Sequence, residues 1–270
     1  MKSSIKSFIF FLLVSCSICG IDLNKWELFE KDVSFFAMRG TIMWKITTTP
    51  DSNGGGNEVH YWDNSIQNWV KDQGSLGCVA LALSNSELFC RNKFKTIGKR
   101  GSEQANPAWS DALFQSNDIK IHAAGNIYYI TNTAQNGAFQ IRSYDSQTDI
   151  SMLKPGDGIK VAPISSGLYY FLSDTGVIQK LSSSGFVTLP ESATDIFAGS
   201  DDKPVIVSKE VVPEGFKIKK WNTEEETWQE FEGIGGVSLA FDSWDLPYIV
   251  TNAGEVYRMR GVISNVCPSK

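Results

Sequence analysis

The stretch WQEFEGIGGVSLAFDSWDLPYIVTNAGEVYRMRG, from Trp228 to Gly261, contains the pattern that decides the fold. A tryptophan and a large apolar residue come first, followed by a glycine-rich bend and the segment V-S-L-A. A polar turn, the apolar segment P-Y-I-V, the turn N-A-G and the alternating segment E-V-Y-R then follow. Short apolar or alternating runs separated by turn residues predict β-strands. The stretch therefore predicts four short strands joined by turns.

Weaker copies of this unit recur along the whole chain. Each copy has an aromatic or apolar anchor and, about 12 residues later, a small residue. The six pairs are Trp26 with Ala37, Trp69 with Ala80 or Ala82, Trp109 with Ala123, Ile150 with Ala162, Phe186 with Ala198, and Trp228 with Ala240. Successive small residues lie about 36 to 45 residues apart, a spacing typical of four-stranded propeller blades. The pattern predicts an all-β fold, a six-bladed β-propeller of four-stranded antiparallel blades.

The two ends of the repeat complement each other. Trp26 to Phe29 resembles a fourth strand with no first three before it, and Glu255 to Arg260 resembles a third strand with no fourth after it. We expect the N-terminal strand to complete the last blade and close the ring, because closure removes an open sheet edge. A linear β-solenoid is the alternative. Residues 47–57, 99–107 and 209–215 are expected to be loops on one rim.

Residues 1–20 have the features of a secretory signal peptide. Two lysines precede an apolar run from Phe8 to Val14, and small residues follow it. The run is too short to span a bilayer comfortably, so we expect cleavage between Ser17 and Gly20. Residues 21–270 would then form a single propeller domain. These features predict a secreted, extracellular protein without membrane insertion.

Charge and cysteine content restrict the partners and the compartment. Loss of the two signal-peptide lysines takes the net charge from −5 to about −7, and an acidic surface argues against nucleic acid and anionic membranes. Three cysteines remain, an odd number for an oxidising compartment. Cys78 and Cys90 flank a predicted hairpin and are the candidate disulfide. Cys267 is free, links to another chain, or replaces one of the other two in the bridge.

Motifs for catalysis or metal binding are scarce. The chain has no nucleophile elbow, HExxH motif, phosphate loop or dinucleotide fingerprint. Its histidines, His60 and His122, lie in predicted strands, and the cysteines lack metal-ligand spacing. The segment from Ser243 to Pro247 matches a sialidase-type S-x-D-x-G-x-x-W box only in part. We therefore predict a protein that is not an enzyme and needs no cofactor.

The repeat unit W-x-x-F-x-G…V-S-L-A-x-D…P-Y-I-V-x-N-x-x-G-x-V-Y-R resembles the tectonin repeat of tectonin and tachylectin-type β-propeller lectins. The copy from Trp228 to Arg258 matches well, two copies match through GLYYFLSDTGVIQKL and DIFAGSDDKPVIV, and the first three match mainly through spacing. The resemblance implies a six-bladed propeller that binds glycans or glycoproteins without catalysis, or an adhesive or scaffolding role. The chain departs from the family at the second-strand tryptophan, which only Trp44 retains.

Carbohydrate binding uses aromatic faces beside polar side chains. Trp244 lies in a polar turn between Asp242 and Asp245, and Trp62 ends a predicted strand beside two polar residues. These four residues are the candidate ligand site, with packing as the alternative role of both tryptophans. The anchor tryptophans are instead expected to pack between blades. The acidic turns that contain Asp201 and Asp202, and Asp242 and Asp245, are also candidates for a Ca²⁺ site.

Two functions remain open at this point. The leading hypothesis is a lectin-like propeller that binds glycans or glycosylated surfaces through sites between blades or on loops. The alternative is a structural, protein-interacting component of an extracellular or cell-surface assembly, in which Cys267 links chains. Erosion of the first three copies favours the alternative. The basic run Lys217, Lys219 and Lys220 is either a solvated face or a patch for acidic glycans.

Overall fold

The computed structural model describes residues 26–75, 77–84, 86–102, 109–122, 125–135, 138–165, 167–242 and 245–259, without the side chains of 111–113. Within these residues the regular elements are 22 β-strands and no helix. The predicted all-β class is therefore confirmed. The proposed signal peptide, Trp244 and Cys267 lie outside the described residues. Across the described ranges, no helix is long and apolar enough to span a membrane.

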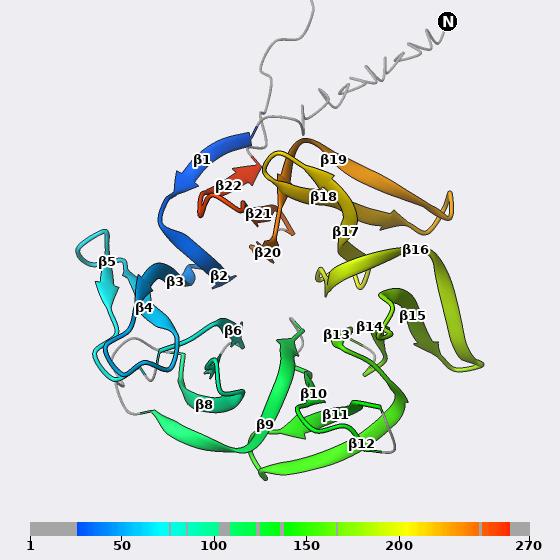
Figure 1. Ribbon diagram of the computed structural model, residues 1–270, viewed down its shortest axis with the longest axis horizontal. Coiled ribbons are helices and arrows are strands. Elements are labelled where there is room, and N and C mark those ends of the chain that lie inside the picture. Colours follow the sequence, from blue (N-terminus) through cyan, green and yellow to red (C-terminus); the bar gives the residue numbers. More distant parts are fainter. Residues whose placement is uncertain are drawn as a thin grey trace, which may run out of the picture.

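The strands form four antiparallel sheets arranged around a common centre (Figure 1). The two four-stranded sheets consist of β2 (Val33–Arg39), β3 (Ile42–Pro50), β4 (Asn57–Asp63) and β5 (Asn68–Lys71), and of β20 (Ser238–Phe241), β21 (Pro247–Val250), β22 (Val256–Met259) and β1 (Trp26–Glu30).

The other two sheets have seven strands each. One consists of β6 (Ala80–Leu83), β7 (Glu87–Arg91), β8 (Thr96–Gly101), β9 (Ser110–Ile121), β10 (Ile127–Thr131), β11 (Gln140–Asp145) and β12 (Ile150–Asp157). The other consists of β13 (Lys160–Pro163), β14 (Tyr169–Leu172), β15 (Val177–Ser182), β16 (Gly185–Ala198), β17 (Pro204–Val212), β18 (Gly215–Asn222) and β19 (Thr227–Gly236).

Two long strands, β9 and β16, each pair with different partners along their two halves. In β9, Ser110 and Gln115 pair with β8, whereas Ser116 and Ile121 pair with β10. In β16, residues 185–192 pair with β15 and residues 193–198 pair with β17. Each seven-stranded sheet therefore contains two groups of strands that share one long strand.

The first and last described strands are neighbours. Trp26 pairs with Met259 and Leu28 pairs with Tyr257, so β1 lies antiparallel to β22 (Figure 1). The side chains of Glu27 and Arg258 also form an ion pair across the two strands. Residues from opposite ends of the described chain thus complete one sheet.

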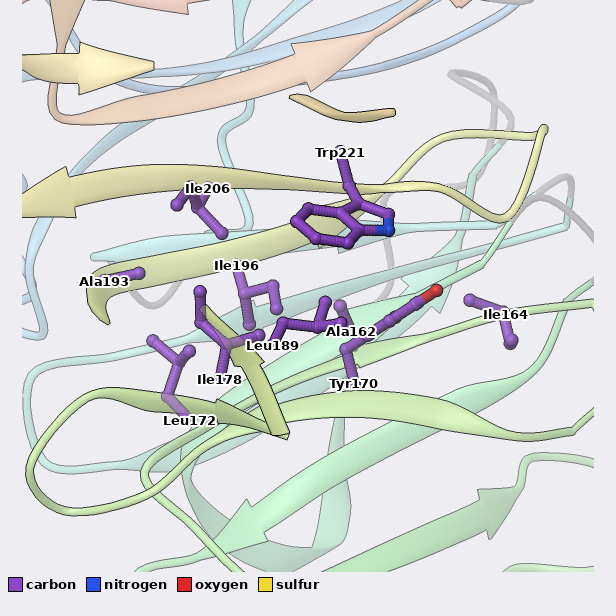
Figure 2. Close-up of a cluster of buried hydrophobic side chains, with 10 residues drawn as sticks. All are labelled: Ala162, Ile164, Tyr170, Leu172, Ile178, Leu189, Ala193, Ile196, Ile206 and Trp221. Carbon is purple, nitrogen blue, oxygen red and sulfur yellow. The ribbon is translucent and has the colours of Figure 1, made fainter. Parts of the chain in front are cut away.

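Large apolar side chains fill the space between neighbouring groups of strands. β10, β14 and β21 are buried along almost their whole length, as expected of strands covered on both faces. Figure 2 shows one cluster, which combines residues of β13 to β16 with Ile206 of β17 and Trp221 of β18. Full burial of an aliphatic side chain contributes about 1.5–3 kcal/mol, so these clusters hold adjacent groups of strands together.

The four anchor tryptophans connect neighbouring groups of strands. Each indole nitrogen donates one hydrogen bond. Trp26 donates to the Glu232 carbonyl (2.9 Å) and Trp228 to the Pro190 carbonyl (2.6 Å). Trp69 donates to the Glu30 carboxylate and Trp109 to the Asp72 carboxylate (2.6 Å). The sequence predicted this packing role. The two anchors that are not tryptophan differ, because Ile150 is 55% exposed and Phe186 is 47% exposed.

Two other expectations have clear outcomes. Cys78 and Cys90 form the predicted disulfide, with 5.7 Å between their Cα atoms. The expected loops are partly wrong, because β3 extends to Pro50, β8 covers residues 99–101, and β17 and β18 take up most of 209–215. In the last case Val211 pairs with Phe216, and such β-branched and aromatic residues favour extended strands.

Candidate functional site

The strands β2, β6, β9, β13, β16 and β20 surround the centre of the molecule (Figure 1). Residues of these strands and of adjoining turns line a cavity of about 400 Å³. Five of the recurring small residues line it: Ala37, Ala82, Ala162, Ala198 and Ala240. The sixth, Ala123, lies outside the described residues. Small side chains at these positions leave the central space open, so the repeat encodes a cavity as well as close packing.

Partly buried ion pairs connect three of the strands around this axial cavity. The Lys160 ammonium lies 3.4 Å from Asp118 and 3.2 Å from Asp195, and Lys120 lies 3.3 Å from Asp195. Burial opposes the charged form of Lys160, but the two carboxylates outweigh it and raise its pKa. Burial likewise opposes ionised Asp195, but the two lysines outweigh it and lower its pKa. These charges neutralise one another inside the fold.

Turns around the cavity are joined by repeated serine–aspartate contacts. Asp245 accepts hydrogen bonds from the backbone nitrogen of Ser200 (2.7 Å) and from its hydroxyl (2.5 Å). Asp202 makes the same pair of contacts with Ser165. Both aspartates have a positive φ, of 59° and 60°, a conformation that aspartate adopts more readily than most residues. The carboxylates therefore hold adjacent turns together.

The predicted ligand residues are spread over separate places. Asp242 and Asp245 line the axial cavity, and Asp242 accepts a hydrogen bond from the Leu246 nitrogen (2.9 Å). Trp62 lies on β4, half-buried, with its ring edge-on to that of Trp69 at 5.5 Å. Trp244 lies outside the described residues. Among described residues, no cluster of three or more His, Cys, Asp or Glu side chains is arranged to hold a metal ion.

A second hollow, which we call the lateral groove, has a volume of about 280 Å³. Residues from β9 to β12 and from the turn after β10 line it: Phe114, Gln115, Tyr129, Thr131, Asn132, Thr133, Gln135, Arg142, Tyr144, Asp149 and Ser151. Phe114 stacks on Tyr129 with 4.1 Å between ring centroids. Aromatic rings and neutral hydrogen-bonding side chains therefore share one concave surface.

Hydrogen bonds fix the polar wall of the lateral groove. Ser151 binds both the Tyr129 hydroxyl (2.7 Å) and the Arg142 Nε (2.9 Å). Asp149 accepts hydrogen bonds from Lys99 and Tyr144, which lower its pKa. Burial and the bond to Asp149 raise the pKa of Tyr144. The wall is therefore held in one arrangement before any ligand arrives.

The basic run on β18 is neutralised within the protein. Lys217 pairs with Glu210 and Glu230, and Lys219 pairs with Glu191 and Glu210. Lys220 lies 2.9 Å from Asp201. These pairs favour the solvated-face interpretation over a patch for acidic glycans.

The lateral groove was not predicted from the sequence. Its residues come from four strands whose repeat copies are eroded, so no single motif contains them. The only signal was the amide-rich segment TNTAQNGAFQ after β10, which is longer than a tight turn requires. The axial cavity was not predicted either, although the recurring small residues that line it are a signal in the sequence that could have indicated it.

Comparison with known proteins defines the fold class. No family model and no curated protein matches the chain. Solved structures similar to it include YCF48 bound to a D1 peptide, at 16% identity and a TM-score of 0.52, covering 91% of this chain and 86% of that one. U3-55K has 9% identity and a TM-score of 0.55, covering 89% and 99%. A chain of the mitotic checkpoint complex has 9% identity and a TM-score of 0.54, covering 97% and 99%. This chain thus has a β-propeller fold.

Proposed function

We propose that this chain is a secreted, non-catalytic propeller of the tectonin type, which binds glycans or glycosylated surfaces. The observation that carries this proposal is the lateral groove, where stacked Phe114 and Tyr129 adjoin the side chains of Gln115, Asn132 and Thr133. Tyr129 is only 3% exposed and lies against Phe114, so the half-buried Phe114 ring would make the apolar contact with a sugar. Amides and hydroxyls would exchange hydrogen bonds with the sugar hydroxyls.

The proposal includes six four-stranded blades and a closed ring. If β9 and β16 are each divided between their two partner strands, the two seven-stranded sheets become four blades. The two four-stranded sheets are the other two blades. The pairing of β1 with β22 supports closure by the N-terminal strand. A closed ring has no open sheet edge between its first and last blades, which favours solubility and fixed placement of surface sites.

Secretion is supported by two features of the chain. The apolar run from Phe8 to Val14 behind two lysines is typical of a signal peptide. The Cys78–Cys90 disulfide fits an oxidising compartment. Expression of the full chain in a eukaryotic secretory host, followed by N-terminal sequencing of medium protein, tests this part. A protein that stays inside the cell and still begins with Met1 would contradict secretion.

A glycan array with the mature chain tests the binding function. We expect binding to a restricted set of glycans and loss of that binding when Thr133 is replaced by Trp, because the indole would fill the lateral groove. Lys31→Gln, a change at a site whose side chain is 62% exposed, is the matched control. Absence of binding to every glycan at high micromolar protein would contradict the proposal.

A second candidate function is protein interaction in an extracellular assembly. The outer strand β12 favours it, because Ile150, Met152 and Leu153 are 53–58% exposed along one edge. Exposed apolar edge strands are uncommon unless a partner covers them. YCF48, a structurally similar protein, is bound to a peptide. Sedimentation of the mature chain under reducing and non-reducing conditions separates a monomer from an assembly linked through Cys267.

A further inference from the structure

We propose that the lateral groove selects a carboxylate-bearing sugar and that Arg142 recognises the carboxylate. This inference rests on the proposed glycan-binding function and specifies the class of ligand. Arg142 is the one cationic side chain among the described residues that line the groove. The other lining side chains are aromatic, amide or hydroxyl groups, except Asp149. The Asp149 carboxylate already accepts hydrogen bonds from Lys99 and Tyr144.

The guanidinium of Arg142 is held in place by neutral partners. Its Nε donates to the Ser151 hydroxyl at 2.9 Å, and Nη2 reaches the Ser151 carbonyl at 3.4 Å. Its Nη1 reaches the Gln140 side-chain oxygen at 3.4 Å. A guanidinium has five N–H donors, so each terminal nitrogen retains one donor after its contacts with described residues. Two donors on adjacent nitrogens match the two oxygens of a carboxylate.

The charge of Arg142 is not cancelled inside the groove. Asp149 is the acidic residue of the lining, and its carboxylate lies 2.7 Å from the Lys99 ammonium and also accepts the Tyr144 hydroxyl. The hydrogen-bond partners of Arg142 in the described part of the chain carry no charge. A half-buried cation with neutral partners attracts an anionic ligand more strongly than a fully solvated one, because fewer water molecules screen it.

The remainder of the groove suits the sugar ring. Asn132 donates to Gln115 at 2.6 Å, which orients both amides at the groove surface. Thr133 and Gln135 are exposed at the opening. The volume of about 280 Å³ is just below the range typical of small-molecule sites. One terminal sugar with its carboxylate on Arg142 therefore fits better than a long oligosaccharide.

The inference is tested by measuring how tightly the full mature chain binds three oligosaccharide probes. One probe ends in glucuronate, one in the methyl ester of glucuronate and one in glucose. We expect the glucuronate probe to bind at least tenfold more tightly than the other two. Arg142→Gln should remove this preference, and Arg142→Lys should restore only part of it, because lysine keeps the charge but not the paired donors. Lys31→Gln should bind as the unmodified chain does, which controls for net charge.

Each other outcome has a defined meaning. Equal binding of glucuronate and glucose probes, or unchanged preference in a folded Arg142→Gln chain, would overturn the inference while leaving glycan binding intact. Absence of binding to any probe and to the wider array would overturn both proposals. If Arg142→Gln does not fold, Thr133→Trp replaces it, since this change blocks the groove from an exposed position. Retained glucuronate preference in Thr133→Trp would place the site elsewhere.

Discussion

The indole nitrogen of Trp26 donates a hydrogen bond of 2.9 Å to the carbonyl oxygen of Glu232, which lies 206 residues further along the chain. The same side chain meets the ring of Phe231 edge-on, with 6.2 Å between centroids. On its other side, Trp26 pairs through its backbone with Met259. The first described strand therefore contacts β22 through its backbone and β19 through the side chain of Trp26.

Replacing Trp26 with Ala should destabilise the whole propeller. The change removes the hydrogen bond to Glu232 and the contact with Phe231, and it weakens attachment of β1 to β22. Trp26 is only partly buried, so the cost should be roughly 2 kcal/mol, below the 3–5 kcal/mol of a core tryptophan. Urea-induced unfolding followed by fluorescence measures it. Leu28→Ala on the same strand, 45% exposed, should cost much less. Equal effects would argue against a closing role for Trp26.

The sequence predicts strand positions well where the repeat is well kept. In the stretch that contains V-S-L-A and P-Y-I-V, β20 and β21 fall where the alternation and turns place them. The glycine-rich bend also has a physical reason. A Cβ on Gly236 would lie 2.3 Å from Ile249 and 2.8 Å from the Val250 carbonyl. Only glycine allows this approach of β19 to β21.

The sequence predicts less where contacts join distant copies. The local pattern does not show that β9 and β16 each continue as one strand from one group into the next. In β16 the partner changes just after Pro190 and Glu191, whose φ is 84°. The lateral groove likewise depends on Phe114, Tyr129 and Arg142, which lie in three strands. The periodicity of a strand indicates which face of the sheet a side chain is on. It does not indicate which side chains from other strands lie beside it.

Removal of the disulfide should lower stability without changing the fold. Cys78 and Cys90 are 12 residues apart, and a closed loop of this size contributes about 3 kcal/mol in the chain-entropy model. The double change to Ser should therefore lower the urea midpoint. Reductant should have the same effect on the unmodified chain and none on the double variant. If reductant leaves the midpoint of the unmodified chain unchanged, the bridge does not support the fold.

The partly buried charges around the axial cavity should define a pH range of maximal stability. Asp195 has a pKa below its ordinary value of 3.8, so its stabilising contribution is present above that value and is lost as the pH falls further. Lys160 has a pKa above 10.5, so its contribution is present below that value and is lost as the pH rises beyond it. Unfolding free energies measured between about pH 3 and pH 11 should fall at both ends.

A variant of Asp195 tests whether the pH dependence of stability comes from these ion pairs or from the net charge of the protein. Asp195→Asn removes the carboxylate shared by Lys120 and Lys160, so it should reduce overall stability and flatten the acidic end of the profile. Asp174→Ala removes an acidic group from an exposed turn and should leave the profile unchanged. A profile for Asp195→Asn that is parallel to that of the unmodified chain would contradict the assignment.

Asp245 allows a direct test of structural against ligand-binding roles. Asp245→Ala removes both contacts to Ser200 and places alanine at a φ of 59°, which should cost about 1–2 kcal/mol. Asp245→Asn keeps an acceptor oxygen and a side chain that tolerates positive φ, so its cost should be smaller. Thermal unfolding measures both, with Asp174→Ala as the control, and the same proteins are assayed on the glycan array. We expect lower stability with unchanged glycan binding, because the lateral groove lies on β9 to β12. The reverse result, unchanged stability with lost binding, would place the ligand site at the turn that contains Asp245.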